Sequence, residues 1–107
     1  NTVDVIAEKV SVDASVMKDI SFKFKKSESN LLMMLVSENN SKVVITIMIT
    51  DDLVEKGRHA GTLIREVSSE VNGGGGGQPF FATAGGSDPS GIPSAIKKFK
   101  QLIWYTY

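Results

Sequence analysis

Side chains able to do covalent or metal chemistry are scarce in this sequence. It contains one histidine, His59, and no cysteine, so neither a thiolate site nor the usual histidine-rich metal site is expected. No serine, histidine and aspartate stand in a pattern typical of nucleophilic catalysis. The adjacent carboxylates Asp51 and Asp52 are interpreted as helix caps, and His59 as a surface or helix-end residue. The residues therefore predict that this chain contains no enzyme active site.

Backbone chemistry gives a stronger signal, because five consecutive glycines, Gly73–Gly77, lie in the middle of the chain. Successive glycine N–H groups can form anion-binding concavities. The run is not a nucleotide-binding P-loop, which needs a Lys-Ser/Thr pair leading into a helix. A flexible linker is the alternative, but the nearby Phe80-Phe81 and the second pair Gly85-Gly86 favour binding or close packing. For a binding loop, a side chain at its centre, Gly75, is expected to obstruct the ligand with little effect on the fold.

The charge of the chain is balanced. Twelve basic and twelve acidic side chains give a formal net charge of zero, which argues against strong non-specific binding of long nucleic acids. Two lysine clusters are compatible with a local basic surface that binds nucleic acid. The more ordinary interpretation of each cluster is a solvent-exposed helix face. The clusters are Lys23, Lys25 and Lys26, and Lys97, Lys98 and Lys100.

One domain over residues 1–107 must position these groups, because a chain of this length supports one core and hardly two. Apolar patterns predict strands at 3–12, 31–36 and 43–49 and a short extended segment at 78–84. They predict helices at about 14–27 and 58–72, and a last helix that begins between 88 and 93 and ends at about 104. They also predict a short helical turn that Asp51 or Asp52 caps and that ends at Gly57. The glycine run and the segment 85–89 are expected to be loops. The order βαββαβα predicts an α+β fold, with helices covering a mixed β-sheet.

The sequence contains no targeting or membrane signal. No apolar run approaches the roughly 20 residues that span a bilayer. No basic segment precedes an apolar one at the start, so no secretion signal is expected. The first residue is Asn1 rather than Met, which suggests an excised or processed piece of a larger protein.

The segment Gly73–Gly86, GGGGGQPFFATAGG, resembles the glycine-rich signature of the C-terminal domain of alanyl-tRNA synthetases. The same domain type, the DHH-associated domain, occurs in DHH-family phosphoesterases. The similarity extends to Thr50–Gly57, Ala60–Ile64 and the closing helix at Asp88–Ile96, and the continuation Ala-Thr-Ala-Gly-Gly favours the synthetase branch. One position departs from the pattern: Gln78 stands where the synthetases carry Arg or Lys and the phosphoesterases carry His.

The resemblance implies a non-catalytic module of an alanine–tRNA ligase, which holds the elbow of tRNA while upstream domains aminoacylate and edit. The implied partners are alanine-specific tRNA and the upstream domains of the same chain, in the cytoplasm and without membrane contact. No cofactor is implied for this domain; the parent enzyme would use ATP and Mg²⁺, with Zn²⁺ in its editing domain. The resemblance implies that ten residues contact the RNA: Gly73, Gly74, Gly75, Gly76, Gly77, Gln78, Gly85, Gly86, Arg58 and Arg65. The two arginines are the weaker candidates.

Two other functions stay open. The chain is alternatively the substrate-binding domain of a DHH-family phosphoesterase. It is alternatively a homodimerisation module, in which the apolar tail Leu102–Tyr107 is an interface rather than the end of a core helix.

Phe80 and Phe81 are expected on opposite sides of the chain, because side chains alternate in an extended segment. One is therefore expected in the core and the other at the surface beside the glycines.

Overall fold

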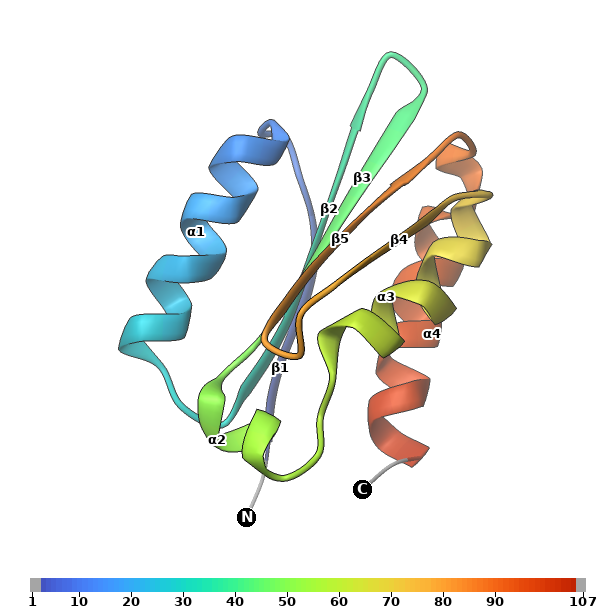
Figure 1. The fold of residues 1–107 in the computed structure, drawn as a ribbon. Helices are drawn as coiled ribbons and strands as arrows, with labels where there is room; N and C mark the ends of the chain where they lie inside the picture. Colours follow the sequence, from blue (N-terminus) through green and yellow to red (C-terminus); the bar gives the residue numbers. More distant parts are fainter. Residues whose placement is uncertain (1–2, 106–107) are drawn as a thin grey trace.

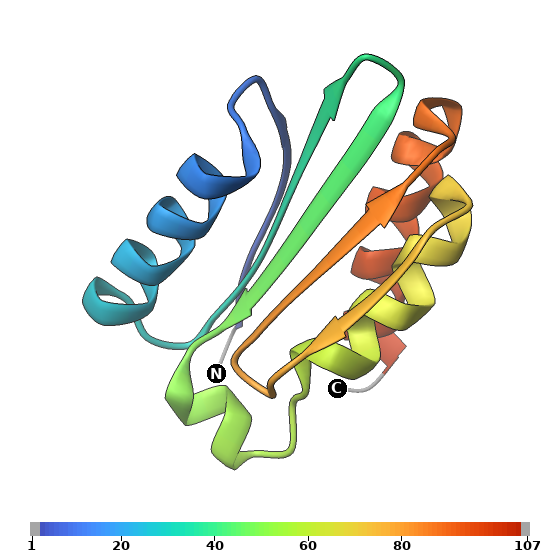
Figure 2. The same cartoon turned by 45° about the horizontal axis from the view of Figure 1, so that its top comes forward.

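The computed structural model describes residues 3–105, which form a five-stranded mixed sheet with helices on both faces (Figure 1). The strand order is β1-β2-β3-β5-β4. Helix α1 covers one face of the sheet, and helices α3 and α4 cover the other (Figure 2). The α+β class and the mixed sheet predicted from the sequence are confirmed.

The N-terminal part is a strand–helix–strand unit. Strand β1 (Asp4–Val10) runs parallel to β2 (Leu31–Asn39), and α1 (Ala14–Ser27) connects them. Asp13 caps α1 as predicted, because its carboxylate accepts the N–H of Val16 at 3.0 Å. This cap satisfies one of the N–H groups that the first turn of a helix leaves without a partner.

Strands β2 and β3 (Lys42–Ile49) form the predicted antiparallel hairpin. Its turn residues Asn40 and Ser41 have φ angles of 52° and 65°, the left-handed conformation that favours two-residue hairpin turns. Both strands are largely buried on both sides, as their continuous apolar runs predict. The buried side chains form two clusters, one under α1 and one under α3 and α4.

The segment after β3 is a short helix, α2 (Asp51–Glu55). Its N-cap position is Thr50, so the prediction that Asp51 or Asp52 caps this turn is wrong by one residue. The Asp52 carboxylate instead accepts the N–H of Asn30 at 2.9 Å. A hydrogen bond with the Thr50 side chain is the main cause of a lowered pKa of Asp52. These contacts tie the beginning of β2 to the beginning of α2.

Helix α3 (Ala60–Ser68) continues as a 3₁₀ turn, η1 (Ser69–Val71). The chain then leaves the helix at Asn72, whose φ angle is 55°. His59 is the N-cap of α3, and its Nδ1 accepts the N–H of Thr62 at 3.2 Å. The expected helix-end position of this histidine is confirmed.

The main difference from the expected order of elements is that the glycine run is a strand. Strand β4 (Gly74–Gly77) pairs antiparallel with β5 (Phe81–Gly86), which also pairs with β3. The loop predicted for the glycines is therefore wrong, and Gly85-Gly86 also lie in a strand. Glycine is depleted in strands because it has no side chain to pack. Pairing with β5 and packing against α3 order the run instead.

The chain ends in a helix on the face that α3 covers. After the 3₁₀ turn η2 (Pro89–Gly91), helix α4 (Ile92–Tyr105) packs beside α3. Ile103 is buried and Leu102 is packed against the same cluster, so this part of the apolar tail is the end of a core helix. Thr106 and Tyr107 lie outside the described residues. Within residues 3–105, no helix is long and apolar enough to cross a membrane.

Candidate nucleic-acid interface

Alternate glycines of the run have opposite surroundings. A Cβ atom built on Gly75 would collide with the carbonyl oxygen of Thr83 and lie 2.5 Å from the Cα atom of Ala84. A Cβ on Gly73 or Gly77 would also collide with the backbone of β5. Only glycine allows β4 to approach β5 this closely. The fold itself therefore explains the three glycines at odd positions.

Gly74 and Gly76 differ, because a side chain on either would have room. A Cβ on Gly74 would meet nothing within 4 Å, and one on Gly76 would meet only Nη2 of Arg65, at 4.0 Å. Neither glycine has a positive φ angle; among the described glycines, Gly57 alone does, at 100°. The fold thus gives no steric or conformational reason for glycine at these two positions. The missing side chains leave space that another molecule can enter.

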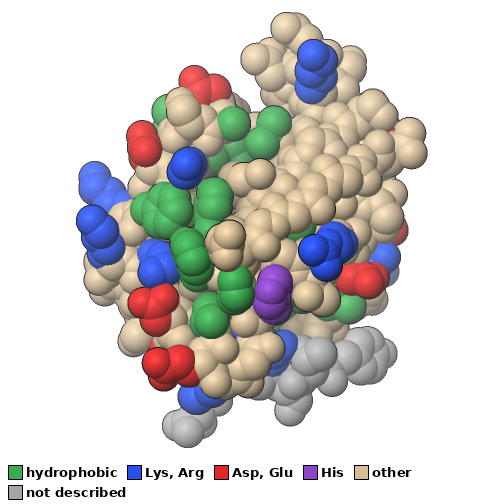
Figure 3. Space-filling view, viewed as in Figure 1, with side chains coloured by type: hydrophobic (Ala, Val, Ile, Leu, Met, Phe, Trp, Pro, Cys, Tyr) green, Lys and Arg blue, Asp and Glu red, His purple; other side chains and the backbone are tan. Residues whose placement is uncertain are grey.

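The register places this space next to an exposed part of β5. Gly74 pairs with Gly85, and Gly76 pairs with Thr83; Thr83 and Gly85 are both exposed. Helix α1 packs on β2 and β3 and contacts β5 at Phe81. We call Gly74, Gly76, Thr83 and Gly85 the open sheet surface. In Figure 3 the region of β4 and β5 is a band with few charged or hydrophobic side chains.

Three phenylalanines lie where the open sheet surface meets α1. The ring centroid of Phe22 is 5.0 Å from that of Phe81 and 6.4 Å from that of Phe80. Phe81 precedes Thr83 by two residues, so both side chains lie on the same side of β5. We call the three rings the aromatic cluster. All three are half-buried, so the expected division of Phe80 and Phe81 into one core and one surface residue is met only in part. Phe81 packs against the cluster under α1.

Two lysines of α1 lie over these rings. The Nζ atom of Lys18 is 6.0 Å from the ring centroid of Phe22, and that of Lys25 is 5.0 Å from the centroid of Phe80. Lys25 also forms a salt bridge with Asp51 at 2.9 Å. No sequence pattern groups Phe22 and Lys18 with the glycine segment. Their spacing with Lys25 places them on one face of α1, but only the tertiary structure brings that face to Phe80.

Gln78 and Arg65, two of the predicted contacts, border the glycine strand. Gln78 is exposed in the turn between β4 and β5, where its N–H donates to the carbonyl oxygen of Phe81 at 2.8 Å. Arg65 is exposed on α3, next to Gly76. The structure therefore brings one charged and one neutral polar side chain to the edge formed by β4.

Arg58 and Gly86 are placed less favourably for RNA. Arg58 is half-buried, and its Nη2 atom is shielded from solvent, so it presents less of its guanidinium to a phosphate than Arg65 does. A Cβ on Gly86 would lie 2.5 Å from Cγ2 of Val71. Packing against η1 therefore accounts for Gly86 without a ligand.

The two predicted lysine clusters lie on opposite faces of the sheet, since one is on α1 and the other on α4. In the α4 cluster, Lys98 forms a salt bridge with Glu70 at 3.5 Å. The α1 cluster includes Lys25 and therefore adjoins the aromatic cluster. In Figure 3, both basic and acidic side chains border the hydrophobic patch beside α1.

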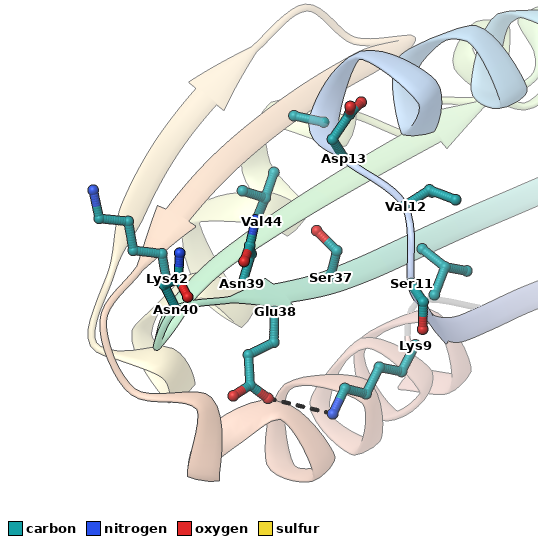
Figure 4. A pocket seen from close by; sticks show the side chains of 12 residues that line it. Lys9, Ser11, Val12, Asp13, Ser37, Glu38, Asn39, Asn40, Lys42 and Val44 are labelled. Atoms are coloured by element: carbon teal, nitrogen blue, oxygen red, sulfur yellow. Dashed lines mark hydrogen bonds and ion pairs between the residues drawn. The ribbon is translucent and has the colours of Figure 1, made fainter.

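A hollow of about 730 Å³ lies between the start of α1 and the turn of the β2–β3 hairpin (Figure 4). A salt bridge of 3.3 Å between Lys9 and Glu38 lies at its rim. Val44 lines the hollow and pairs with Gly85, so the hollow adjoins the open sheet surface. It contains none of the predicted contact residues. Within residues 3–105, no three His, Cys, Asp or Glu side chains are grouped closely enough to hold a metal ion.

Comparison with known proteins assigns this fold to a family. The sequence model of the DHHA1 domain family matches residues 2–104. The chain belongs to the DHHA1 domain family. The alanine–tRNA ligase of Cytophaga hutchinsonii is 47% identical over 94 residues, which cover 87% of this chain and 10% of the ligase. That of Christiangramia forsetii is 38% identical over 104 residues, covering 96% of this chain and 12% of the ligase. This DHHA1 chain thus spans about a tenth of the length of these relatives.

A solved structure has the same fold as this DHHA1 domain. The C-Ala domain of the alanyl-tRNA synthetase of Aquifex aeolicus matches with a TM-score of 0.85 at 23% sequence identity. The match covers 94% of each chain. The predicted similarity to the C-terminal domain of alanyl-tRNA synthetases is therefore confirmed by both sequence and fold.

Proposed function

We propose that this domain is a non-catalytic RNA-binding module of an alanine–tRNA ligase, and that it binds alanine-specific tRNA through the open sheet surface. The observation that carries the proposal is the difference between alternate glycines of the run Gly73–Gly77. Gly73, Gly75 and Gly77 are required by the close approach of β5, whereas Gly74 and Gly76 face free space. A ligand that must reach the backbone supplies the missing reason for glycine at these two positions.

The chemistry of β4 suits RNA. Within residues 3–105 it is the last strand of the sheet, so one edge of its backbone is paired with no described strand and offers N–H donors and carbonyl acceptors. Proteins recognise RNA through its shape, its exposed bases and its 2′-hydroxyl groups, and such groups can approach a backbone that carries no side chains. The exposed Arg65 beside Gly76 adds a positive charge for a phosphate.

The relatives favour this function over the alternative of a phosphoesterase domain, because those compared above carry the name alanine–tRNA ligase. Since the chain spans about a tenth of their length, we assign ATP, Mg²⁺ and Zn²⁺ chemistry to other domains of a cytoplasmic parent protein. This domain then holds tRNA for the domains that aminoacylate and edit, and it needs no cofactor itself.

Gly74→Val tests the proposal. The sequence-based choice of Gly75 for this substitution is wrong, because a Cβ there would strike β5. At Gly74 a side chain has room, and valine favours a strand more than glycine does. We expect the midpoint of thermal unfolding to stay the same or rise, and the affinity of the chain for alanine-specific tRNA to fall about tenfold or more, which corresponds to ~1.4 kcal/mol.

The matched control is Val5→Ile, which enlarges an exposed side chain on β1, the strand at the other edge of the sheet. Its tRNA affinity should equal that of the unchanged chain. Equal affinity of a folded Gly74→Val variant would exclude β4 from the tRNA interface.

A further inference from the structure

The aromatic cluster has the features of a stacking site rather than of a core. A buried apolar core would hide these rings from water, yet Phe22, Phe80 and Phe81 are each half-buried. Phe22 and Phe81 are tilted by 34° with centroids 5.0 Å apart, and Phe22 and Phe80 by 53° with centroids 6.4 Å apart. The three rings therefore form one continuous apolar surface that is partly open to solvent.

The backbone on both sides of Phe80 is held in place. The carbonyl oxygen of Phe80 accepts the N–H of Ile49 at 2.9 Å, at the end of β3. The carbonyl oxygen of the preceding Pro79 accepts the N–H of Ala60 at 2.8 Å, at the start of α3. The ring of Phe80 is thus presented by a turn fixed to two elements, and a ligand that stacks on it need not order a loop first.

Positive charge is arranged around the same rings. The ammonium groups of Lys18 and Lys25 lie 6.0 Å and 5.0 Å from the ring centroids of Phe22 and Phe80. Lys23 and Lys26, which follow Phe22 and Lys25 directly in α1, are exposed. Rings that accept the face of a base, bordered by cations that meet the neighbouring phosphates, are the combination by which proteins hold single-stranded nucleic acid.

We propose that the aromatic cluster binds one unpaired nucleobase of an RNA by stacking, chiefly on the face of Phe80 that Lys25 does not cover, while Lys18 contacts a phosphate beside that base. This inference rests on the proposed function in that the RNA also covers the neighbouring open sheet surface. It adds a second site to the interface, one that recognises a base face rather than a backbone edge. Alternation along β5 places Phe81 and Thr83 on the same side, so one strand of RNA can contact both parts.

The test compares three substitutions at Phe80 by tRNA affinity and thermal unfolding of this chain. Phe80→Leu keeps an apolar side chain but removes the ring, and it should lower the affinity about 5- to 150-fold, which is the loss of about 1–3 kcal/mol typical of one stacked base. Phe80→Tyr and Phe80→Trp keep a ring face and should retain the affinity within about threefold, a smaller change than the loss of one stacked base. Rescue by an aromatic side chain separates stacking from simple packing.

A second measurement needs no variant. Ultraviolet cross-linking of the unchanged chain to alanine-specific tRNA, followed by mass spectrometry, should place a cross-linked nucleotide on the peptide that contains Phe80 or on the one that contains Phe22. Cross-links confined to other peptides would contradict stacking, even where Phe80→Leu fails to fold.

The two proposals fail in different ways. Undiminished tRNA affinity of a folded Phe80→Leu variant, together with weakened binding by Gly74→Val, would overturn the stacking site and leave the proposed function intact. Undiminished affinity of both variants would remove this face from the interface altogether.

Discussion

The run Gly73–Gly77 contains two sets of glycines, and a different physical reason accounts for glycine in each set. At Gly73, Gly75 and Gly77 a side chain would strike the backbone of β5, whereas at Gly74 and Gly76 it would have space. The first set is needed for β4 and β5 to pair closely, whereas the fold does not explain why the second set lacks side chains. Stability should respond to the first set and binding to the second.

The largest expected effect is on the folding side. In Gly75→Ala the added methyl group would collide with the carbonyl oxygen of Thr83 and lie 2.5 Å from Cα of Ala84, so β4 must move away from β5. We expect a loss of about 3 kcal/mol or more in the free energy of unfolding, the upper range for an over-packed site. Urea unfolding followed by circular dichroism measures it.

Gly74→Ala is the matched control, because the same methyl group there meets nothing within 4 Å. Its stability should stay within about 0.5 kcal/mol of the unchanged chain. Similar losses for both variants would show that the alternation of the glycines has no steric meaning.

A smaller effect is expected at Arg65, whose guanidinium adjoins Gly76. Arg65→Gln should weaken tRNA binding several-fold and make the slope of log affinity against log salt shallower by about one phosphate's contribution. The total slope of the unchanged chain should correspond to fewer than about five phosphates, given its net charge of zero.

Lys100→Gln is the control for charge, since Lys100 is exposed on α4, which packs against β1 and β2. An equal change of slope in this variant would mean that Arg65 acts only through overall charge.

The smallest expected effect contrasts two threonines that pair across β3 and β5. Thr46 is buried, and its hydroxyl has no hydrogen-bond partner among the described residues, whereas its neighbour Thr83 is exposed. Thr46→Val removes a buried, unsatisfied hydroxyl and should raise the free energy of unfolding by about 1 kcal/mol, with tRNA affinity unchanged. A loss of stability in chemical unfolding would contradict the assignment of this hydroxyl as unsatisfied.

The elements that carry side-chain patterns could be predicted from the sequence. The cap at Asp13, the hairpin from Leu31 to Ile49 and the end of a core helix at Ile103 follow from apolar spacing and local hydrogen bonding. The strand Gly74–Gly77 could not, because glycines have no side-chain periodicity and pair here through contacts made by β5 and α3.

Only part of the candidate site could be predicted, because some of its features depend on contacts between elements that are distant in the sequence. The glycine signature and the exposed Arg65 are readable in the sequence, whereas the division between odd and even glycines depends on the backbone of β5. The aromatic cluster also depends on tertiary structure, since Phe22 and Phe80 are 58 positions apart along the chain. The N-cap of α2 is Thr50 rather than an aspartate. Residue propensities do not locate the end of a helix to within one residue.

The most direct test of the open sheet surface is an NMR titration of the isotope-labelled, unchanged chain with alanine-specific tRNA. The amide signals of Gly74, Gly76, Thr83 and Gly85 should shift or broaden most, together with those around Phe80, while the signals of the exposed residues of α4 stay in place. The largest changes on α4 or on β1, with the β4 and β5 amides unmoved, would contradict the proposal that tRNA binds where the glycines leave the sheet open.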